Sequence, residues 1–436
     1  MANIVFMPFH WAADMNATFA LARKLQHRGH RVYYATIPDT EERIRTQGFE
    51  WVPAFREVFP KGELARQDVA EAQGQAYGVD QLRNRVRGMC DLLRKGEINR
   101  ATREIKPDLL VVSSGMPWLG IAAPSSGIPV VQFSSTLISV EDSSVPPFRT
   151  SLMPANSLSS RLKIAYTWKK LLLRRRLRNK AFDFSDELKQ LARDCGFPVN
   201  KIDFLVETWP RPLLPELVFC PPEFDFPRRK MPACAFFVEA SIDLERKEET
   251  TFPWSRLQQG KPIILCALGS LVTVRAASEA ARFFQMLLDA ISQRPSIQAV
   301  VAIGSALKSE SFNCPENALL VPYVPQIELL MQCAAMVGHG GFSSVKEAIF
   351  MGVPMLLIPL AYDEPGNAAR VVYHGLGLRL DREQVSPDTL GNSIDRLLND
   401  GSFLANARRM SQKFIEVEQR SPACEIIEKM LAGQAP

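Results

Sequence analysis

Short apolar runs of strand length alternate with longer amphipathic segments along the whole chain. Glycine, proline or polar residues bound the runs, and such alternation is typical of a parallel β-sheet wrapped by helices. The runs lie at 3–9, 32–37, 108–114 and 129–135 in the first half, and at 262–270, 298–304, 318–324, 334–340 and 354–360 in the second. The pattern predicts an α/β protein with two doubly wound, Rossmann-like domains in series.

A charged segment that contains prolines, residues 239–262, lies between the two sets of runs. This composition is typical of an interdomain linker. We therefore predict an N-terminal domain over 1–245 and a C-terminal domain over 246–436, with a last helix that can pack back on the N-terminal domain. Ligands of open α/β sheets bind beyond the carboxyl ends of the strands, so two such domains facing each other would form a central cleft.

The composition is that of a globular protein, since 46% of the 436 residues are hydrophobic and 23% are charged. This length suffices for two domains with a core each. The sequence has neither an apolar run of about 18 residues nor a basic start followed by a long apolar stretch, so we expect a cytoplasmic protein. The eight cysteines are scattered without a C-x-x-C pair, and we expect them to be reduced, buried small residues rather than zinc ligands or a disulfide framework.

The formal net charge of +5 comes from one segment. Residues 161–180 hold nine Lys or Arg and no acidic residue, whereas the rest of the chain holds 43 basic and 47 acidic residues. The charge is therefore local and does not indicate nucleic-acid binding. On a helix these residues interleave with apolar ones, which fits either a solvated helix packing its leucines on the domain below or a surface helix that meets anionic lipid at the inner membrane face.

The stretch "VGHGGFSSVKEAIFMGVP", residues 337–354, forms a strand-to-helix corner with candidate chemistry. Its glycines remove side chains, so that backbone can approach a ligand closely. Ser343 and Ser344 then open a helix whose free N–H groups make an anion site. The alternative is that Ser344 and Glu347 only form a capping box, S-x-x-E. His339 favours a diphosphate, because an anion would give its ring a partner in this crowded corner.

The segment "YVPQIELLMQCAAMVGHGGFSSVKEAIFMGVPMLLIPLAYDEPGNAARV", residues 323–371, closely resembles the donor-binding signature of the family 1 UDP-glycosyltransferases. That signature runs W-x-P-Q, H-C-G-W-N-S-x-x-E, G-V-P, D/E-Q and N-A. The tail "DEPGNAARVVYHGLG" looks most like the bacterial zeaxanthin and macrolide glucosyltransferase branch. The resemblance implies a GT-B fold and inverting, metal-independent transfer from a nucleotide sugar, without a bound cofactor.

The resemblance also assigns roles on the donor side. Tyr323 would stack on the nucleobase, Gln326 would lie near base and ribose, and Glu347 would hold the ribose hydroxyls. The other donor-binding candidates are Ser270, His339, Gly341, Ser343, Ser344, Asp363 and Glu364. Asp363 and Glu364 match the pair that grips the sugar hydroxyls. The family's residue at position 364 is usually Gln, and Glu removes a hydrogen-bond donor while keeping two acceptors, which leaves the sugar open.

The acceptor half departs from the family, whose catalytic base is a histidine. Counting back from His30 by the family's spacing lands on Asp14, and the aspartate that usually orients the base is Ser113 here. The aspartate at position 14 and the serine at position 113 are consistent with each other, because a carboxylate base needs no partner to fix its tautomer. We predict Asp14 as the general base, with His10 as the rival. The alternatives are that Asp14 is the N-cap of the first helix and that His10 is an ordinary polar residue ending the first strand.

We expect transfer of a hexose, glucose from UDP-glucose, to a hydroxyl of an apolar small-molecule or lipid acceptor. Aromatic, Met and Pro residues at 116–120, 145–154 and 164–168 favour an apolar acceptor, although ordinary core and loop composition explains them nearly as well. Two other functions remain open. One is a GT-B sugar-nucleotide epimerase, which needs no acceptor cleft, and the other is a non-catalytic partner of another glycosyltransferase.

Overall fold

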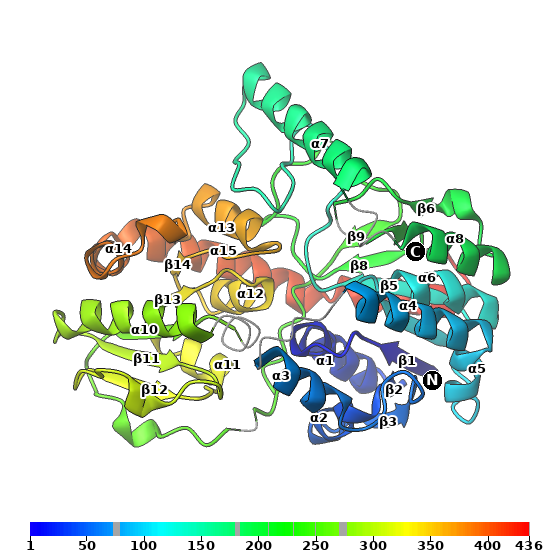
Figure 1. Ribbon diagram of the computed structural model, residues 1–436, viewed down its shortest axis with the longest axis horizontal. Helices are drawn as coiled ribbons and strands as arrows, with labels where there is room; N and C mark the ends of the chain where they lie inside the picture. Colours follow the sequence, from blue (N-terminus) through cyan, green and yellow to red (C-terminus); the bar gives the residue numbers. More distant parts are fainter. Residues whose placement is uncertain are drawn as a thin grey trace.

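The computed structural model describes residues 1–72, 79–178, 184–207, 209–229, 231–248, 250–269 and 277–435. These residues form two parallel sheets, each covered by helices, as the alternating pattern predicts. In Figure 1 the two sheets lie in separate halves of the molecule, and both chain termini lie in the half that contains β1. The architecture is α/β with two facing layers of sheet and helix.

The first sheet has seven strands in the order β3-β2-β1-β4-β5-β8-β9, and each neighbouring pair is parallel. Its central strands are buried on both faces, which explains why they are continuously apolar. The strands are β1 (Asn3–Met7), β2 (Arg31–Thr36), β3 (Glu50–Pro53), β4 (Leu109–Ser113), β5 (Val130–Ser134), β8 (Glu216–Val218) and β9 (Ala235–Phe237). A separate antiparallel pair is formed by β6 (Ile202–Asp203) and β7 (Arg211–Pro212).

The second sheet has six parallel strands in the order β12-β11-β10-β13-β14-β15. The strands are β10 (Ile263–Ala267), β11 (Gln298–Ala302), β12 (Ala318–Val321), β13 (Cys333–Gly338), β14 (Met355–Leu357) and β15 (Gly377–Arg379). All nine predicted runs contain a strand. The sequence pattern missed β3, β6, β7, β8, β9 and β15, each of which spans only two to four residues.

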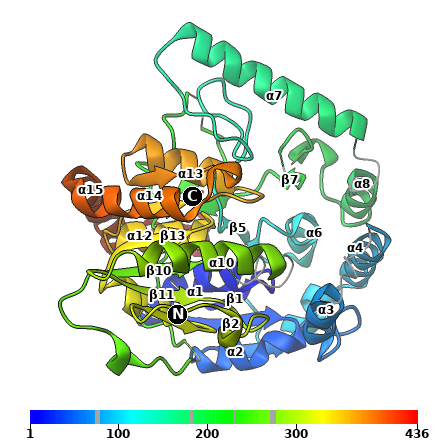
Figure 2. The same cartoon turned by 60° about the vertical axis from the view of Figure 1, so that its left-hand side comes forward.

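Helices cover both faces of each sheet (Figures 1 and 2). In the first half they are α1 (Ala12–His27), α2 (Glu41–Thr46), α3 (Glu63–Ala72), α4 (Val79–Arg94), α5 (Glu97–Thr102), α6 (Pro117–Ala122), α7 (Leu158–Arg178) and α8 (Ser185–Asp194). In the second half they are α10 (Ala277–Ser292), α11 (Gln326–Leu330), α12 (Phe342–Phe350), α13 (Glu364–Tyr373), α14 (Pro387–Asn399), α15 (Gly401–Arg420) and α16 (Pro422–Leu431). In the part of the chain that is described, none of these helices combines the length and apolarity that a membrane span requires.

Buried polar contacts join the two halves. The Arg370 guanidinium on α13 pairs with Asp225 at 2.7 Å, and both side chains are almost fully buried. The Lys346 ammonium on α12 donates to the carbonyls of Phe219 and Ala240 at 3.0 and 2.9 Å. The last helix, α16, packs in the hydrophobic cluster that contains β1 and α1. These contacts hold the carboxyl ends of both sheets in a defined relation.

The cysteines differ partly from expectation. All eight are free thiols, and Cys90, Cys220, Cys266 and Cys424 are buried. Cys314 is exposed and the other three are half-buried, so the prediction of uniformly buried cysteines was wrong. Cys314 lies in the irregular segment before β12, where residue type alone does not predict burial.

Candidate active site

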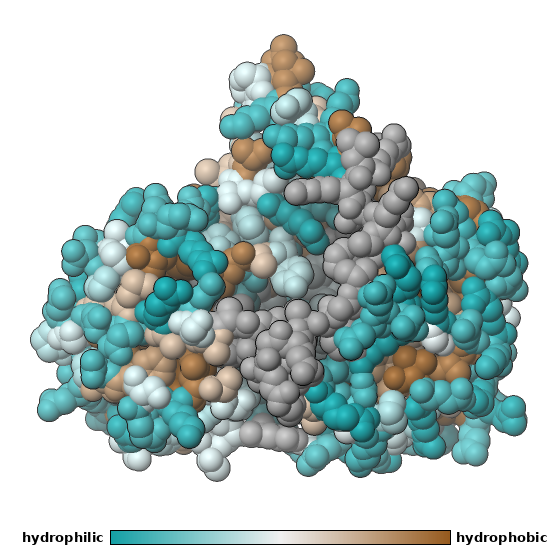
Figure 3. All heavy atoms as spheres, in the orientation of Figure 1, coloured by the Kyte–Doolittle hydropathy of each residue, from teal (hydrophilic) through white to brown (hydrophobic). Residues whose placement is uncertain are grey.

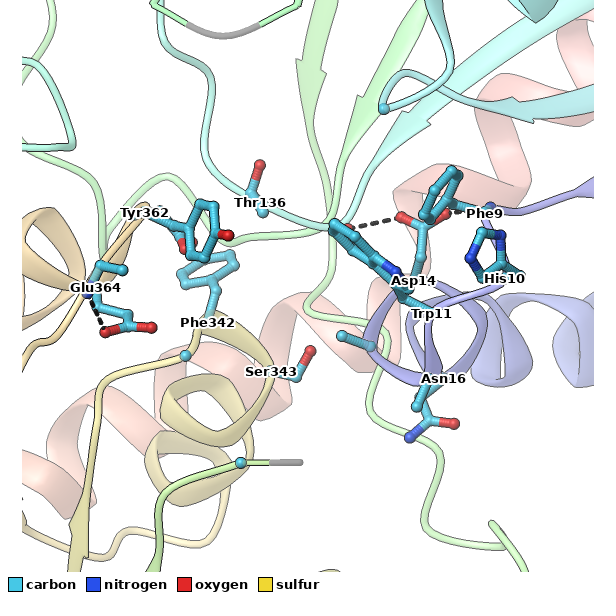
Figure 4. A pocket seen from close by; sticks show the side chains of 18 of the residues that line it. Phe9, His10, Trp11, Asp14, Asn16, Thr136, Phe342, Ser343, Tyr362 and Glu364 are labelled. Carbon is cyan, nitrogen blue, oxygen red and sulfur yellow. Dashed lines mark hydrogen bonds between the residues drawn. The ribbon is translucent and has the colours of Figure 1, made fainter. Parts of the chain in front are cut away.

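A cleft of about 2220 Å³ lies between the two halves. It is larger than the ~300–1,000 Å³ of an ordinary ligand pocket, so it has room for two ligands side by side. Figure 4 shows its two walls. The loop after β1 and the start of α1 bring Phe9, His10, Trp11 and Asp14 to one wall, and the start of α12 and the loop before α13 bring Ser343 and Glu364 to the other.

The corner between β13 and α12 has the close backbone approach that its glycines predict. Gly340 has φ of +94°, a left-handed conformation that favours glycine. A Cβ on Gly341 would lie 2.5 Å from Nε2 of His339, and a Cβ on Gly269 would lie 2.8 Å from Cε1 of the same ring. The glycines therefore make room for the imidazole at the mouth of α12.

The capping-box alternative for Ser344 is wrong. The N-cap of α12 is Gly341, and no side chain caps this helix within the described residues. Ser344 is instead the third residue of the helix, and its hydroxyl accepts a hydrogen bond from Gln326 at 3.2 Å. The hydroxyl of Ser343 points into the space between the two walls (Figure 4). The first N–H groups of α12 thus remain available to an anion.

His339 is neutral in this state of the site. Burial lowers the pKa of its imidazole to about 4, although a hydrogen bond with the Ala267 backbone opposes the shift. A bound diphosphate would restore the charge, because a nearby anion favours the protonated ring.

Glu347 is already paired in the structure. Its carboxylate accepts from the Arg246 guanidinium at 2.7 Å and from the Gln326 amide at 2.5 Å. The side chains of Arg246 and Glu347 are 6% and 5% exposed, so this is a buried ion pair. Arg246 lies in the segment predicted as a linker, and no sequence pattern indicated its role because its partner is 101 residues away.

Of the two remaining donor-binding candidates, Tyr323 and Ser270, the structure describes only Tyr323. Tyr323 follows β12, and half of its surface is exposed. Its hydroxyl donates a hydrogen bond to the Ser305 hydroxyl at 3.0 Å. Its ring lines the cleft together with Gln326. Ser270 lies outside the described residues.

Asp363 and Glu364 sit at the start of α13 and line the cleft. The Glu364 carboxylate accepts the backbone N–H groups of Leu360 and Ala361 at 2.6 and 2.8 Å. Burial nevertheless raises its pKa to about 7, so the side chain is a mixture of acid and carboxylate at neutral pH. Asp363 accepts from the Asn367 amide at 3.0 Å, and burial raises its pKa as well. Among the described residues, no group of three His, Cys, Asp or Glu side chains is placed to hold a metal ion.

Asp14 is buried and held by hydrogen bonds. It is the third residue of α1, whose N-cap is Trp11, so the N-cap alternative is wrong. One carboxylate oxygen accepts from the Phe9 N–H at 2.6 Å and the other from the Ser135 hydroxyl at 2.8 Å. Burial raises its pKa, while hydrogen bonds from Ser135, Phe9 and Ser113 oppose the rise. Ser113 therefore reaches Asp14, as the expected position of the orienting residue requires.

His10 lies beside Asp14 in an aromatic surrounding. Its ring centroid is 4.2 Å from that of Phe9 and 5.5 Å from that of Phe59. Burial, and to a lesser extent Arg85, lower the pKa of His10 to about 4, so the ring is neutral at physiological pH. His10 lies on the same wall of the cleft as Asp14 (Figure 4). With its lowered pKa it is a much weaker base than an ordinary histidine.

Of the segments expected to line an acceptor site, two contribute and one does not. Met116 and Trp118 line the cleft, as does Phe148. The segment 164–168 lies on α7, away from the cleft lining. The aromatic wall that sequence reasoning missed comes from Phe9, Trp11, Phe55, Phe59 and Trp209.

The fold and the cleft define the class of protein. The structure is similar to the solved structure described as the glycotransferase of kitacinnamycin, with a TM-score of 0.73 over 99% of both chains at 23% identity. The fold is therefore GT-B.

Sequence comparisons place the chain more narrowly. Residues 285–432 match the family described as Erythromycin biosynthesis protein CIII-like, C-terminal domain. The chain is 25% identical to zeaxanthin glucosyltransferase of Pantoea ananas, over 98% of this chain and 95% of the relative. It is 23% identical to demethyllactenocin mycarosyltransferase of Streptomyces fradiae, over 100% and 88%. The chain is therefore a distant homologue of zeaxanthin and natural-product glycosyltransferases, and the matches together with the fold identify a nucleotide-sugar glycosyltransferase that acts on small molecules.

Proposed function

We propose that the protein transfers glucose from UDP-glucose to a hydroxyl of an apolar small molecule or lipid, with inversion at the anomeric carbon. The observation that carries this proposal is the placement of the buried Asp14 carboxylate across the cleft from the N-terminus of α12 (Figure 4). A base on one wall and an anion site on the other are what an in-line displacement of a diphosphate requires.

In the proposed reaction the acceptor hydroxyl attacks the anomeric carbon as its proton passes to Asp14. The bond from that carbon to the diphosphate oxygen breaks, and the leaving group is stabilised by the N–H groups of α12, by Ser344 and by His339. The raised pKa of Asp14 helps, because a stronger base takes the proton earlier than an exposed aspartate would.

The donor side supports UDP-glucose in outline. Tyr323 and Gln326 line the cleft next to the Glu347 carboxylate, where a uridine would lie. Asp363 and Glu364 offer several acceptors to equatorial hydroxyls of a hexose. The two relatives named above are a glucosyltransferase and a mycarosyltransferase, so their names point to different sugars. The donor of this protein is therefore tested directly by experiment. Faster transfer from a dTDP-deoxysugar than from UDP-glucose would overturn this assignment.

The acceptor side supports an apolar substrate. The wall next to Asp14 is formed largely by aromatic residues. An epimerase needs no such wall, and a non-catalytic partner needs no base. Hydrolysis and transfer of UDP-glucose, measured with and without a panel of apolar alcohols, separates the three functions. We expect a glucoside that forms only with an alcohol present. Conversion to an epimeric UDP-sugar without an alcohol, or no turnover with any member of the panel, would refute the proposal.

A further inference from the structure

Helix α7 projects from the body of the protein (Figures 1 and 2). It is 21 residues long, and two of its described residues anchor it to the body. Ile164 and Trp168 are buried at 2% and 1% exposure, and the Trp168 indole N–H donates to the Val145 carbonyl at 2.8 Å. The side of the helix that carries these two residues faces the protein, so the opposite side faces outward.

The outward side carries a stripe of large apolar residues. At 100° per residue of an α-helix, its four members fall within an arc of about 80° that lies opposite Ile164 and Trp168. Their exposed fractions are high, so the protein itself does not cover them. The members of this apolar stripe are Leu158 (73% exposed), Leu162 (62%), Tyr166 (65%) and Leu173 (57%). Figure 3 shows hydrophobic atoms at the tip of this projection.

A row of basic residues runs beside the apolar stripe. The same helical geometry places Lys163, Lys170 and Arg174 together on one flank, and Lys169 within the stripe. No acidic residue occurs in α7. The rest of the chain carries more acidic than basic residues, so this helix is a focused positive patch on an otherwise acidic protein.

The apolar stripe and the basic row together indicate what kind of partner α7 contacts. An apolar stripe next to a basic row is the pattern of a helix that lies in the interface of a membrane, with its apolar side chains below the headgroups and its cations at the phosphates. A second copy of this helix would bring positive charge against positive charge. An acidic protein partner would match the basic row, but it would not account for the exposed apolar stripe.

We propose that α7 docks the enzyme on an anionic membrane surface. The same helix is tied through Trp168 to Val145, three residues before Phe148, which lines the cleft. Docking would therefore place the cleft close to the bilayer, where an apolar acceptor concentrates. The docking itself does not depend on the proposed acceptor, and it is measured without any reaction.

The test is sedimentation of the full-length protein with vesicles. One set contains equal parts of phosphatidylglycerol and phosphatidylcholine, and the other contains phosphatidylcholine alone. We expect binding to the anionic vesicles only, and loss of binding at high salt. Changing Lys163, Lys170 and Arg174 to Gln should weaken the partition about 100-fold, because each cation near the surface contributes about fivefold at low salt.

A second variant and a control separate insertion from simple charge attraction. Changing Leu162, Tyr166 and Leu173 to Ser should weaken binding at least tenfold without altering net charge. Changing Arg408, Arg409 and Lys413 to Gln removes three exposed cations from α15 and should leave binding within about twofold of the unaltered protein. Equal binding to both vesicle types, or unchanged binding of the serine variant, would overturn the proposal. So would binding to polyglutamate without binding to vesicles, which would assign the surface to an acidic protein partner.

Discussion

Replacing Asp14 by Asn tests the proposed base with little change in shape. The Asn side chain can accept from the Phe9 N–H through its oxygen and donate to the Ser135 hydroxyl, which is free to rotate, so both contacts that now hold the carboxylate survive. What the amide cannot do is take a proton from the acceptor. We therefore expect the fold and donor binding to persist while transfer fails.

The expected loss of turnover follows from the role of Asp14 as the general base. Loss of a general base lowers turnover by about 100-fold to 10,000-fold, and 100-fold corresponds to about 2.7 kcal/mol of transition-state stabilisation. Initial rates of glucoside formation at saturating UDP-glucose give kcat, and calorimetric titration with UDP gives donor affinity. The Asp14→Asn variant should lose kcat by at least 100-fold and keep its UDP affinity within about twofold.

The pH profile checks the same assignment independently. A base works only above its pKa, and burial raises the pKa of Asp14 above the ordinary value of 3.8. The hydrogen bond from Ser135 opposes that rise because it stabilises the charged form. Ser135→Ala should therefore move the acidic limb of the profile to higher pH. The reasoning is refuted if Asp14→Asn keeps most of its activity while His10→Ala loses it, because the base would then be His10.

Three further predictions concern the donor wall and the junction of the two halves. His339→Ala and Ser344→Ala should each weaken UDP binding by about 1–3 kcal/mol in calorimetry, and unchanged affinity with a lower melting temperature would show a structural role instead. Because Glu364 is protonated below pH 7 and is a stronger acceptor for the sugar hydroxyls once it is charged, KM for UDP-glucose should fall as the pH rises through 7, and Glu364→Gln should abolish this fall; a retained fall would exclude Glu364 as its source. Asp225→Ala should lower the unfolding free energy in urea by about 3–5 kcal/mol, since it leaves the Arg370 charge buried without its partner, and a change below 1 kcal/mol would contradict that.

The sequence predicted the features that depend on neighbours along the chain. The nine strands within the apolar runs, the glycine corner and the start of α12 are local, and their residue types indicate them directly. The sequence could not predict features formed by distant residues. The burial of Asp14 depends in part on Ser135, 121 positions away, and the pairing of Glu347 depends on Arg246. For this reason the sequence indicated neither the raised pKa of Asp14 nor the ion pair of Glu347 with Arg246.

Burial shifts the titratable groups of the cleft toward their uncharged forms. The pKa values of His10 and His339 fall to about 4, and those of Asp14 and Glu364 rise. These four groups therefore contribute little charge to the cleft, and a diphosphate would bring negative charge into a poorly solvated space. That charge must raise the pKa of His339, because the ring lies at the mouth of α12, where the anion would bind. Donor binding would thus take up a proton at the leaving-group end. Departure of the diphosphate would then be assisted by a cation that the donor itself had created, whereas Asp14, on the opposite wall, would keep its capacity to accept a proton.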